Sequence, residues 1–284
     1  MSDAGTDMEP MATIAPPPEL GKTMRVRVGQ HRIRVSISGE GPPLLLINGI
    51  GGNIEMWRPL IEAMPHRQII AFDMPGTGGS STVLVPRPMY FMARITAALV
   101  RKLGYDKVDV LGVSWGGAAA QHLAVGFPGV VRRLVLCATI PGVPSVPGSP
   151  QAMSVLLSRR RYTDRDYLEK VAPTLYGGRI RSEPELLAEQ VRARGGRPPS
   201  TWGYMTQLFS AMTFTNWPTM NMVQAPTLVM SGDDDPIVPL ANARILAFGI
   251  PGAKLHVIEG GGHLFLHTSA PEVAPVIDKF LGTP

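Results

Sequence analysis

A serine between two glycines is the strongest chemical signal in the chain. Residues 112–116 read GVSWG, a G-x-S-x-G pattern. The pattern follows the apolar run VDVLG and precedes a run of small residues, which is the strand–turn–helix context of a nucleophile elbow. Such a turn projects the serine hydroxyl from the edge of a sheet, and its glycines remove side chains that would collide there. We expect Ser114 to be a catalytic nucleophile.

A serine hydroxyl is a weak nucleophile, so it needs a base and an acid that orients the base. After this kind of elbow, the acid precedes the histidine in the chain. The segment PTLVMSGDDDPIVP ends a strand in three aspartates, of which Asp235 is the expected acid. The segment KLHVIEGGGHLFLH places His263, the expected base, after three glycines. We expect Asp233 and Asp234 to cap the turn and the next helix.

The negative oxygen of a tetrahedral intermediate needs preorganised N–H donors. One expected donor is the amide of Trp115, which follows the nucleophile. The other is the amide of Ile50, in the glycine-rich loop NGIGG of residues 48–52. We expect Asn48 and Gly49 to lie against the substrate, with the Asn48 side chain also holding the loop. This loop lacks the last glycine and the acid of a dinucleotide-binding fingerprint.

No metal or cofactor is expected. The three aspartates show no ligand spacing, and no HExxH pattern surrounds His263 and His267. The single Cys137 excludes an intramolecular disulfide and a multi-cysteine zinc site, and we interpret it as a buried small residue. Asp73, in FDMPGTGGSS, is expected to accept hydrogen bonds from loop amides.

The elements that must position these groups alternate between strands and helices. Apolar runs at 44–49, 68–73, 108–114, 133–139, 226–232 and 254–260 are typical of strands buried on both faces. Two further strands are expected around a turn at residues 29–30. Helical spacing is expected at 88–104, 115–127, 238–248 and 271–281. This alternation predicts an α/β fold with a mostly parallel, doubly wound sheet.

Residues 141–225 carry no pattern of a buried strand and predict a helical cap over the carboxyl edge of the sheet. We therefore expect a flexible tail at 1–20, a core at 21–140 and 226–284, and the cap between the core segments. Met205 and Phe209 of the cap are expected to contact substrate. The cap holds ten Lys and Arg against six acids. Two interpretations stay open, a solvated helical face and docking to an anionic or polyester surface.

The amino-acid composition argues against several classes of protein. The chain has 284 residues, of which 44% are hydrophobic, which excludes a disordered chain. The net charge of +5 comes without dense basic tracts, so no nucleic-acid partner is expected. The N-terminus does not resemble a secretory signal, and no apolar run is long enough to span a membrane. We expect a cytoplasmic protein and leave its oligomeric state open.

The motifs together resemble the α/β-hydrolase superfamily, and in more detail the intracellular medium-chain-length poly(3-hydroxyalkanoate) depolymerases. The resemblance rests on INGIGGNIE, IAFDMPGTGGSST, LGVSWGGAAAQ, SRRRY, LYGGRIR and SGDDDPIVPLANARILA. The resemblance implies a triad of Ser114, Asp235 and His263 and a helical lid. It also implies cleavage of ester bonds in a storage polyester, and therefore association with polyester granules. Asn48 departs from the superfamily, in which many members carry histidine there.

Other functions use the same motifs. A general lipase or carboxylesterase, or a hydrolase of carbon–carbon bonds, shares the triad. A non-catalytic binding module of the same fold and a structural protein of the granule surface are alternatives from other classes. Dehalogenases and epoxide hydrolases are disfavoured because they carry aspartate at the position of Ser114.

Overall fold

One eight-stranded sheet forms the centre of the computed structural model, which describes residues 20–158, 160–195 and 198–282. The spatial order is β1-β2-β4-β3-β5-β6-β7-β8. The strands are β1 (Lys22–Val28), β2 (His31–Ser38), β3 (Pro43–Ile47), β4 (Gln68–Phe72), β5 (Val108–Val113), β6 (Val131–Cys137), β7 (Thr227–Gly232) and β8 (Lys254–Ile258). β2 is antiparallel to both its neighbours, and the other pairs are parallel. The predicted mostly parallel sheet is confirmed.

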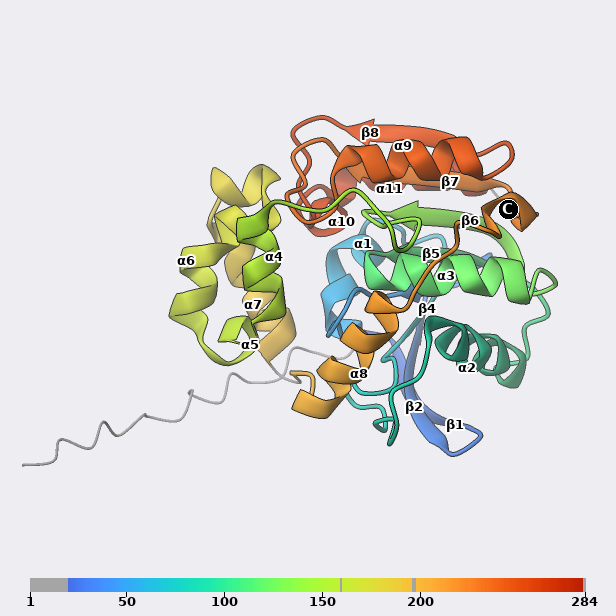
Figure 1. Cartoon of the computed structure of the whole chain (residues 1–284). Coiled ribbons are helices and arrows are strands. Elements are labelled where there is room, and N and C mark those ends of the chain that lie inside the picture. Colours follow the sequence, from blue (N-terminus) through green and yellow to red (C-terminus); the bar gives the residue numbers. More distant parts are fainter. Residues whose placement is uncertain (1–19, 159, 196–197, 283–284) are drawn as a thin grey trace, which may run out of the picture.

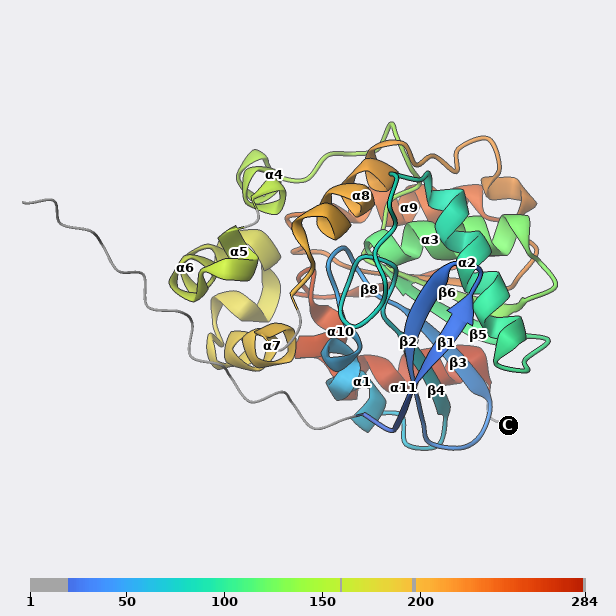
Figure 2. The ribbon, with the colours of Figure 1, turned by 90° about the horizontal axis from the view of Figure 1, so that it is seen from below.

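Helices cover both faces of this sheet, as Figures 1 and 2 show. One face carries α2 (Met89–Lys102), α3 (Trp115–Gly126) and α9 (Leu240–Gly249). The other carries α1 (Arg58–Glu62), α10 (Phe265–Thr268) and α11 (Ala270–Leu281). Successive side chains of a strand point to opposite faces, so Leu45 and Ile47 enter one core while Leu44 and Leu46 enter the other. Burial on both faces explains the continuous apolar runs of β3 to β7. The same expectation is wrong for β8, which is partly exposed because it forms an edge of the sheet.

Between β6 and β7 the described residues form helices and no further strand of the sheet. These helices are α4 (Pro150–Leu157), α5 (Arg160–Thr163), α6 (Arg165–Tyr176), α7 (Glu185–Gly195) and α8 (Thr201–Met212). Single 3-10 turns lie at η1 (Ile54–Trp57), η2 (Gly178–Arg181) and η3 (Met220–Met222). In Figure 1, α4 to α7 project beyond the sheet while α8 lies close to it. The exact division into core and cap stays a prediction, and residues 1–19 of the predicted tail lie outside the described residues.

The basic residues of the cap mostly face water beside acids. Exposed ion pairs one helical turn apart join Arg160 to Asp164, Arg165 to Glu169, and Arg179 to Glu183, each at 2.7 Å. Such pairs stabilise a helix by less than about 1 kcal/mol each. They favour the interpretation of the cap's charge as a solvated helical face. Arg161 is the exception, because its side chain is buried.

A buried arginine ties the sheet to the last helix. The Arg67 side chain is 1% exposed and reaches Asp278 of α11 at 2.5 Å and Asp109 of β5 at 3.4 Å. Its Nη2 also donates to the carbonyl of Gly282 at 2.8 Å. The arginine therefore holds together segments that are far apart in the sequence.

Removing the Arg67 guanidinium leaves the negative charges of Asp109 and Asp278 less well balanced. We expect Arg67→Met to lower the free energy of unfolding by about 3 kcal/mol in a urea titration. Arg165→Met removes an exposed ion pair and is the matched control, with an expected loss below about 1 kcal/mol. An equally small loss for Arg67→Met would contradict the role given to this network.

Candidate active site

Ser114 occupies a sharp turn between β5 and α3. Its φ of +54° lies in a region that non-glycine residues rarely adopt. A Cβ on Gly116 would lie 2.1 Å from the carbonyl oxygen of Ile47, and one on Gly112 would lie 2.5 Å from the carbonyl oxygen of Gly116. Both positions therefore require glycine, which is the steric reason for the G-x-S-x-G pattern.

His263 and Asp235 form a buried pair. His263 Nδ1 lies 2.7 Å from Asp235 Oδ2, and the two side chains are 9% and 0% exposed. The other oxygen, Oδ1, accepts hydrogen bonds from the amides of Ile237 and Val238 at 2.8 and 2.9 Å. With Nδ1 donating to the carboxylate, Nε2 is the ring nitrogen that can accept a proton. This is the arrangement that a general base needs.

The three candidate residues follow strands that end at one edge of the sheet. Ser114 follows β5, Asp235 follows β7, and His263 follows β8, and β5 to β8 are adjacent and parallel. Among the described residues, no hydrogen bond joins Ser114 Oγ to His263. Such bonds are often long in a free enzyme and shorten when substrate binds. The catalytic roles of the three residues stay predictions.

The loop after β3 lies beside the nucleophile. A Cβ on Gly49 would lie 3.9 Å from Ser114 Oγ. Asn48 Nδ2 donates to the carbonyl of Asn53 at 2.8 Å, and its Oδ1 accepts from the Gly49 amide at 2.9 Å. The Asn48 side chain is thus engaged within the loop, as expected for a residue that holds it. Its contact with substrate stays a prediction, as does that of Gly49.

The amides of Trp115 and Ile50 are the expected oxyanion donors. Trp115 is the first residue of α3, where an N–H has no acceptor within the helix. Across the part of the chain that the structure describes, the Ile50 amide also has no backbone acceptor. The next amide of the loop, Gly51, donates instead to Gln207 Oε1 at 2.8 Å. The expected donors are therefore free to bind a substrate oxygen.

Gln207 of α8 forms hydrogen bonds with both segments that carry the expected oxyanion donors. Its side chain accepts from Gly51, and its carbonyl accepts from the Trp115 indole Nε1 at 2.9 Å. The sequence reasoning missed this residue, because nothing local marks it except a polar side chain in an uncharged helix. Met205 and Phe209, the two cap residues expected to contact substrate, are 48% and 43% exposed. Their role stays a prediction.

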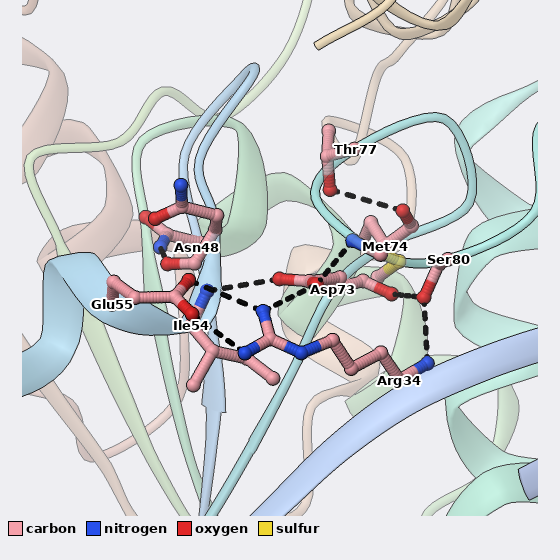
Figure 3. Close-up of polar contacts among 10 residues, drawn as sticks. Arg34, Asn48, Ile54, Glu55, Asp73, Met74, Thr77 and Ser80 are labelled. Atoms are coloured by element: carbon pink, nitrogen blue, oxygen red, sulfur yellow. Dashed lines mark hydrogen bonds and ion pairs between the residues drawn. The ribbon is translucent and has the colours of Figure 1, made fainter. Parts of the chain in front are cut away.

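A buried ion network fixes the loops behind this site (Figure 3). The Arg34 guanidinium lies between Glu55, at 2.6 Å, and Asp73, at 3.2 Å. Asp73 also accepts from the amides of Ile54 and Gly79 at 2.9 and 2.7 Å, which confirms its expected structural role. Burial raises the pKa of the Asp73 carboxyl, although the Gly79 amide and Arg34 oppose the rise. The network holds the loop after β3 against the loop after β4.

A second set of contacts joins the cap to the acid and histidine loops. The amide of His263 donates to the carbonyl of Tyr176 at 2.7 Å. Asp234 accepts from the Gly178 amide at 2.7 Å and from Arg181 Nη1 at 2.7 and 2.8 Å. A Cβ on Gly177 would lie 2.1 Å from the Asp234 carbonyl oxygen. Residues 176–181 therefore pack directly on both loops.

One expectation about the neighbouring aspartates is wrong. Asp233 and Asp234 do not cap the following helix, since α9 begins after Pro239 without a side-chain cap. Asp233 accepts from the Gly260 amide at 2.7 Å in the histidine loop, while Asp234 binds residues 176–181. These partners are distant in sequence, so a local capping rule cannot identify them.

The described residues do not indicate a metal site or a reactive cysteine. They contain no group of three or more His, Cys, Asp or Glu that is placed to hold a metal ion. Cys137 is fully buried, and burial raises the pKa of its thiol, so the reactive thiolate form is disfavoured. Its interpretation as a buried small residue is confirmed.

Comparisons with known proteins agree with the observed fold. The family model described as the alpha/beta hydrolase fold matches residues 42–270. A poly(3-hydroxyalkanoate) depolymerase of Ectopseudomonas oleovorans is 45% identical over 273 residues, which cover 94% of each chain. A pimeloyl-[acyl-carrier protein] methyl ester esterase of Xanthomonas oryzae is 30% identical and covers 88% of this chain and 99% of its own.

Solved structures resemble this one in fold. An enol-lactonase from Burkholderia xenovorans superposes with a TM-score of 0.77 over 91% of this chain and 99% of its own, at 23% identity. At this identity the likeness concerns the fold alone. It agrees with the observed sheet and helix layers.

The contact between Arg181 and Asp234 is open to a direct test. We expect Arg181→Gln to lower kcat for a p-nitrophenyl ester by about tenfold or more, because small displacements of catalytic groups are costly. The melting temperature should change little, since both side chains are partly exposed. Arg165→Gln, in an exposed pair elsewhere in the cap, is the control. An unchanged kcat for Arg181→Gln would show that the contact does not position the loops.

Gln207 is tested by a substitution of similar volume. We expect Gln207→Met to lower kcat by about tenfold and to weaken binding of a boronic acid transition-state analogue by a similar factor, because the oxyanion donors lose their support. Gln190→Met, at another buried cap glutamine, should leave both quantities unchanged. Lower kcat with full affinity for the analogue would contradict a role at the oxyanion donors.

Proposed function

The chain belongs to the α/β-hydrolase family, and we propose that it is a serine esterase that cleaves a poly(3-hydroxyalkanoate). The observation that carries the esterase proposal is the buried pair of His263 and Asp235 at the sheet edge where the Ser114 turn lies. The polyester is proposed because a poly(3-hydroxyalkanoate) depolymerase is 45% identical over 94% of the chain.

The first half of the reaction acylates the serine. His263 Nε2 takes the proton of Ser114 Oγ, which attacks the carbonyl carbon of the ester. Negative charge then develops on the carbonyl oxygen, where the amides of Trp115 and Ile50 donate hydrogen bonds. Asp235 holds the ring of His263 and stabilises its protonated form. The intermediate collapses as His263 gives its proton to the oxygen of the departing alcohol.

The second half releases the acid. Water takes the place of the alcohol, and His263 removes one of its protons while the oxygen attacks the acyl carbon. The same two amides stabilise the second tetrahedral intermediate. When it collapses, the bond to Ser114 Oγ breaks and the proton returns to that oxygen. One ester and one water have then become one alcohol and one carboxylic acid.

The surface of α8 supports an apolar, uncharged substrate. Its polar Thr206, Gln207 and Ser210 are buried, whereas four of its large apolar side chains are exposed on the opposite face. These exposed residues are Trp202, Met205, Phe209 and Met212. Residues 198–232, which include α8, contain no charged side chain. An exposed apolar surface of this kind beside a catalytic site is typical of a binding surface for apolar material.

The cellular location belongs to the proposal. Over the described residues, every helix is too short or too polar to cross a membrane. We propose that the enzyme acts in the cytoplasm on polyester granules, since its substrate would be stored there. A soluble ester is the runner-up substrate, because a methyl ester esterase is 30% identical over most of the chain.

The proposal is tested by measuring hydrolysis of the polymer by the wild-type protein and by a Ser114 variant. We expect the wild-type protein to release 3-hydroxy acids from amorphous medium-chain poly(3-hydroxyalkanoate) granules, and Ser114→Ala to lower the rate by about 10⁴-fold or more without unfolding. Cleavage of small p-nitrophenyl esters without any release from granules would replace the polymer by a soluble ester. Full turnover by Ser114→Ala would overturn the serine mechanism.

A further inference from the structure

Arg161 of α5 is a buried cation without a carboxylate partner. The residue is 4% exposed, and no ion pair to it occurs among the described residues. Nη2 donates to the hydroxyl of Tyr204 at 2.9 Å, while Nε is buried without any acceptor. The adjacent Arg160 is exposed and pairs with Asp164. The proposed ester cleavage does not involve the Arg161 guanidinium.

Aromatic rings surround the guanidinium. Its Cζ lies 4.5 Å from the centre of the Tyr162 ring and 5.7 Å from that of Tyr204. Tyr176 is also close enough to interact with it electrostatically. Ring faces partly compensate a buried cation, but they provide no acceptor for the in-plane Nε–H of Arg161. Buried arginines in proteins are normally paired with an anion.

The surrounding tyrosines connect Arg161 to the candidate active site. The Tyr162 hydroxyl donates to the carbonyl of Ile50, in the oxyanion loop, at 3.1 Å. Tyr176 accepts at its carbonyl from the amide of His263. Tyr204 lies one turn before Gln207 on α8. One tyrosine ring thus separates the unpaired cation from the loop that would bind the ester oxygen.

We propose that Arg161 binds the carboxylate of a 3-hydroxy acid, either at the free end of the polyester chain or in the released product. A guanidinium whose Nε–H has no acceptor matches a planar carboxylate in shape and charge. In a 3-hydroxyacyl chain only a two-carbon spacer separates this carboxylate from the alcohol oxygen of the preceding ester bond. The identity of the acid rests on the proposed function, whereas the binding of a carboxylate does not.

The first experiment uses soluble probes and needs no polymer. Hydrolysis of p-nitrophenyl octanoate by the wild-type enzyme is inhibited with 3-hydroxyoctanoate and, separately, with the uncharged 3-hydroxyoctanamide. We expect an inhibition constant for the carboxylate at least about tenfold below that for the amide. Equal inhibition constants would overturn the proposal, and this comparison requires no variant.

Variants then assign the effect to one side chain. Arg161→Gln should raise the inhibition constant of the carboxylate by about tenfold and leave that of the amide unchanged. Arg160→Gln removes the same charge from the exposed neighbouring residue and should change neither constant. If thermal melting shows that Arg161→Gln is unfolded, Arg161→Lys keeps the charge but loses the fork of donors, and an intermediate inhibition constant is expected. An inhibition constant of the carboxylate that equals the wild-type value in every folded Arg161 variant would overturn the assignment.

A second experiment identifies the source of the carboxylate. The substrates are a dimer of 3-hydroxyoctanoate with a free carboxylate and the same dimer as its methyl ester. A kcat/KM about tenfold higher for the free acid supports recognition of the chain end during cleavage. Equal values, with selective inhibition by the free acid, support binding of the product. If neither dimer is cleaved, the polyester function fails while the inhibition experiment still decides the role of Arg161.

Discussion

The backbone conformation of Ser114 is the constraint on which the candidate site depends. A positive φ at a serine is unfavourable, and the surrounding sheet must hold it in place. Gly112 and Gly116 permit this, because a Cβ at either position would collide with backbone atoms. The same turn begins α3 and so leaves the Trp115 amide without a helical acceptor. The proposed nucleophile and one proposed oxyanion donor therefore arise from one turn.

The residues between β6 and β7 contribute to the site itself as well as covering it. Residues 176–181 bind the loops that carry Asp235 and His263, and Gln207 binds the loop of Ile50 together with the indole of Trp115. The loop after β7 also inserts Ile237 and Val238 into the apolar core of the cap. Movement of these helices would therefore displace the loops that carry the proposed catalytic residues. In the proposed mechanism, contacts of this kind would link substrate binding at the cap to the geometry of Ser114, Asp235 and His263.

Sequence patterns predicted the features that depend on local rules. The buried strands were recognisable because side chains on both of their faces are apolar, and the Ser114 turn because its glycines are sterically required. Gln207, Arg181 and Arg161 were missed as site residues because their roles come from contacts with segments distant in the chain. Asp234 shows most clearly where local sequence rules fail. Its position before a helix predicts a helix cap, but its partners lie in residues 176–181. Buried polar side chains acquire their meaning only from the packed structure.

In the proposed mechanism, His263 and Asp235 activate Ser114 as a nucleophile. Reaction with a fluorophosphonate probe, followed by mass spectrometry of the digested protein, tests this activation. We expect a single adduct on the peptide that contains Ser114, formed much more slowly in His263→Ala. An adduct on another residue, or an unchanged rate of labelling in His263→Ala, would contradict it.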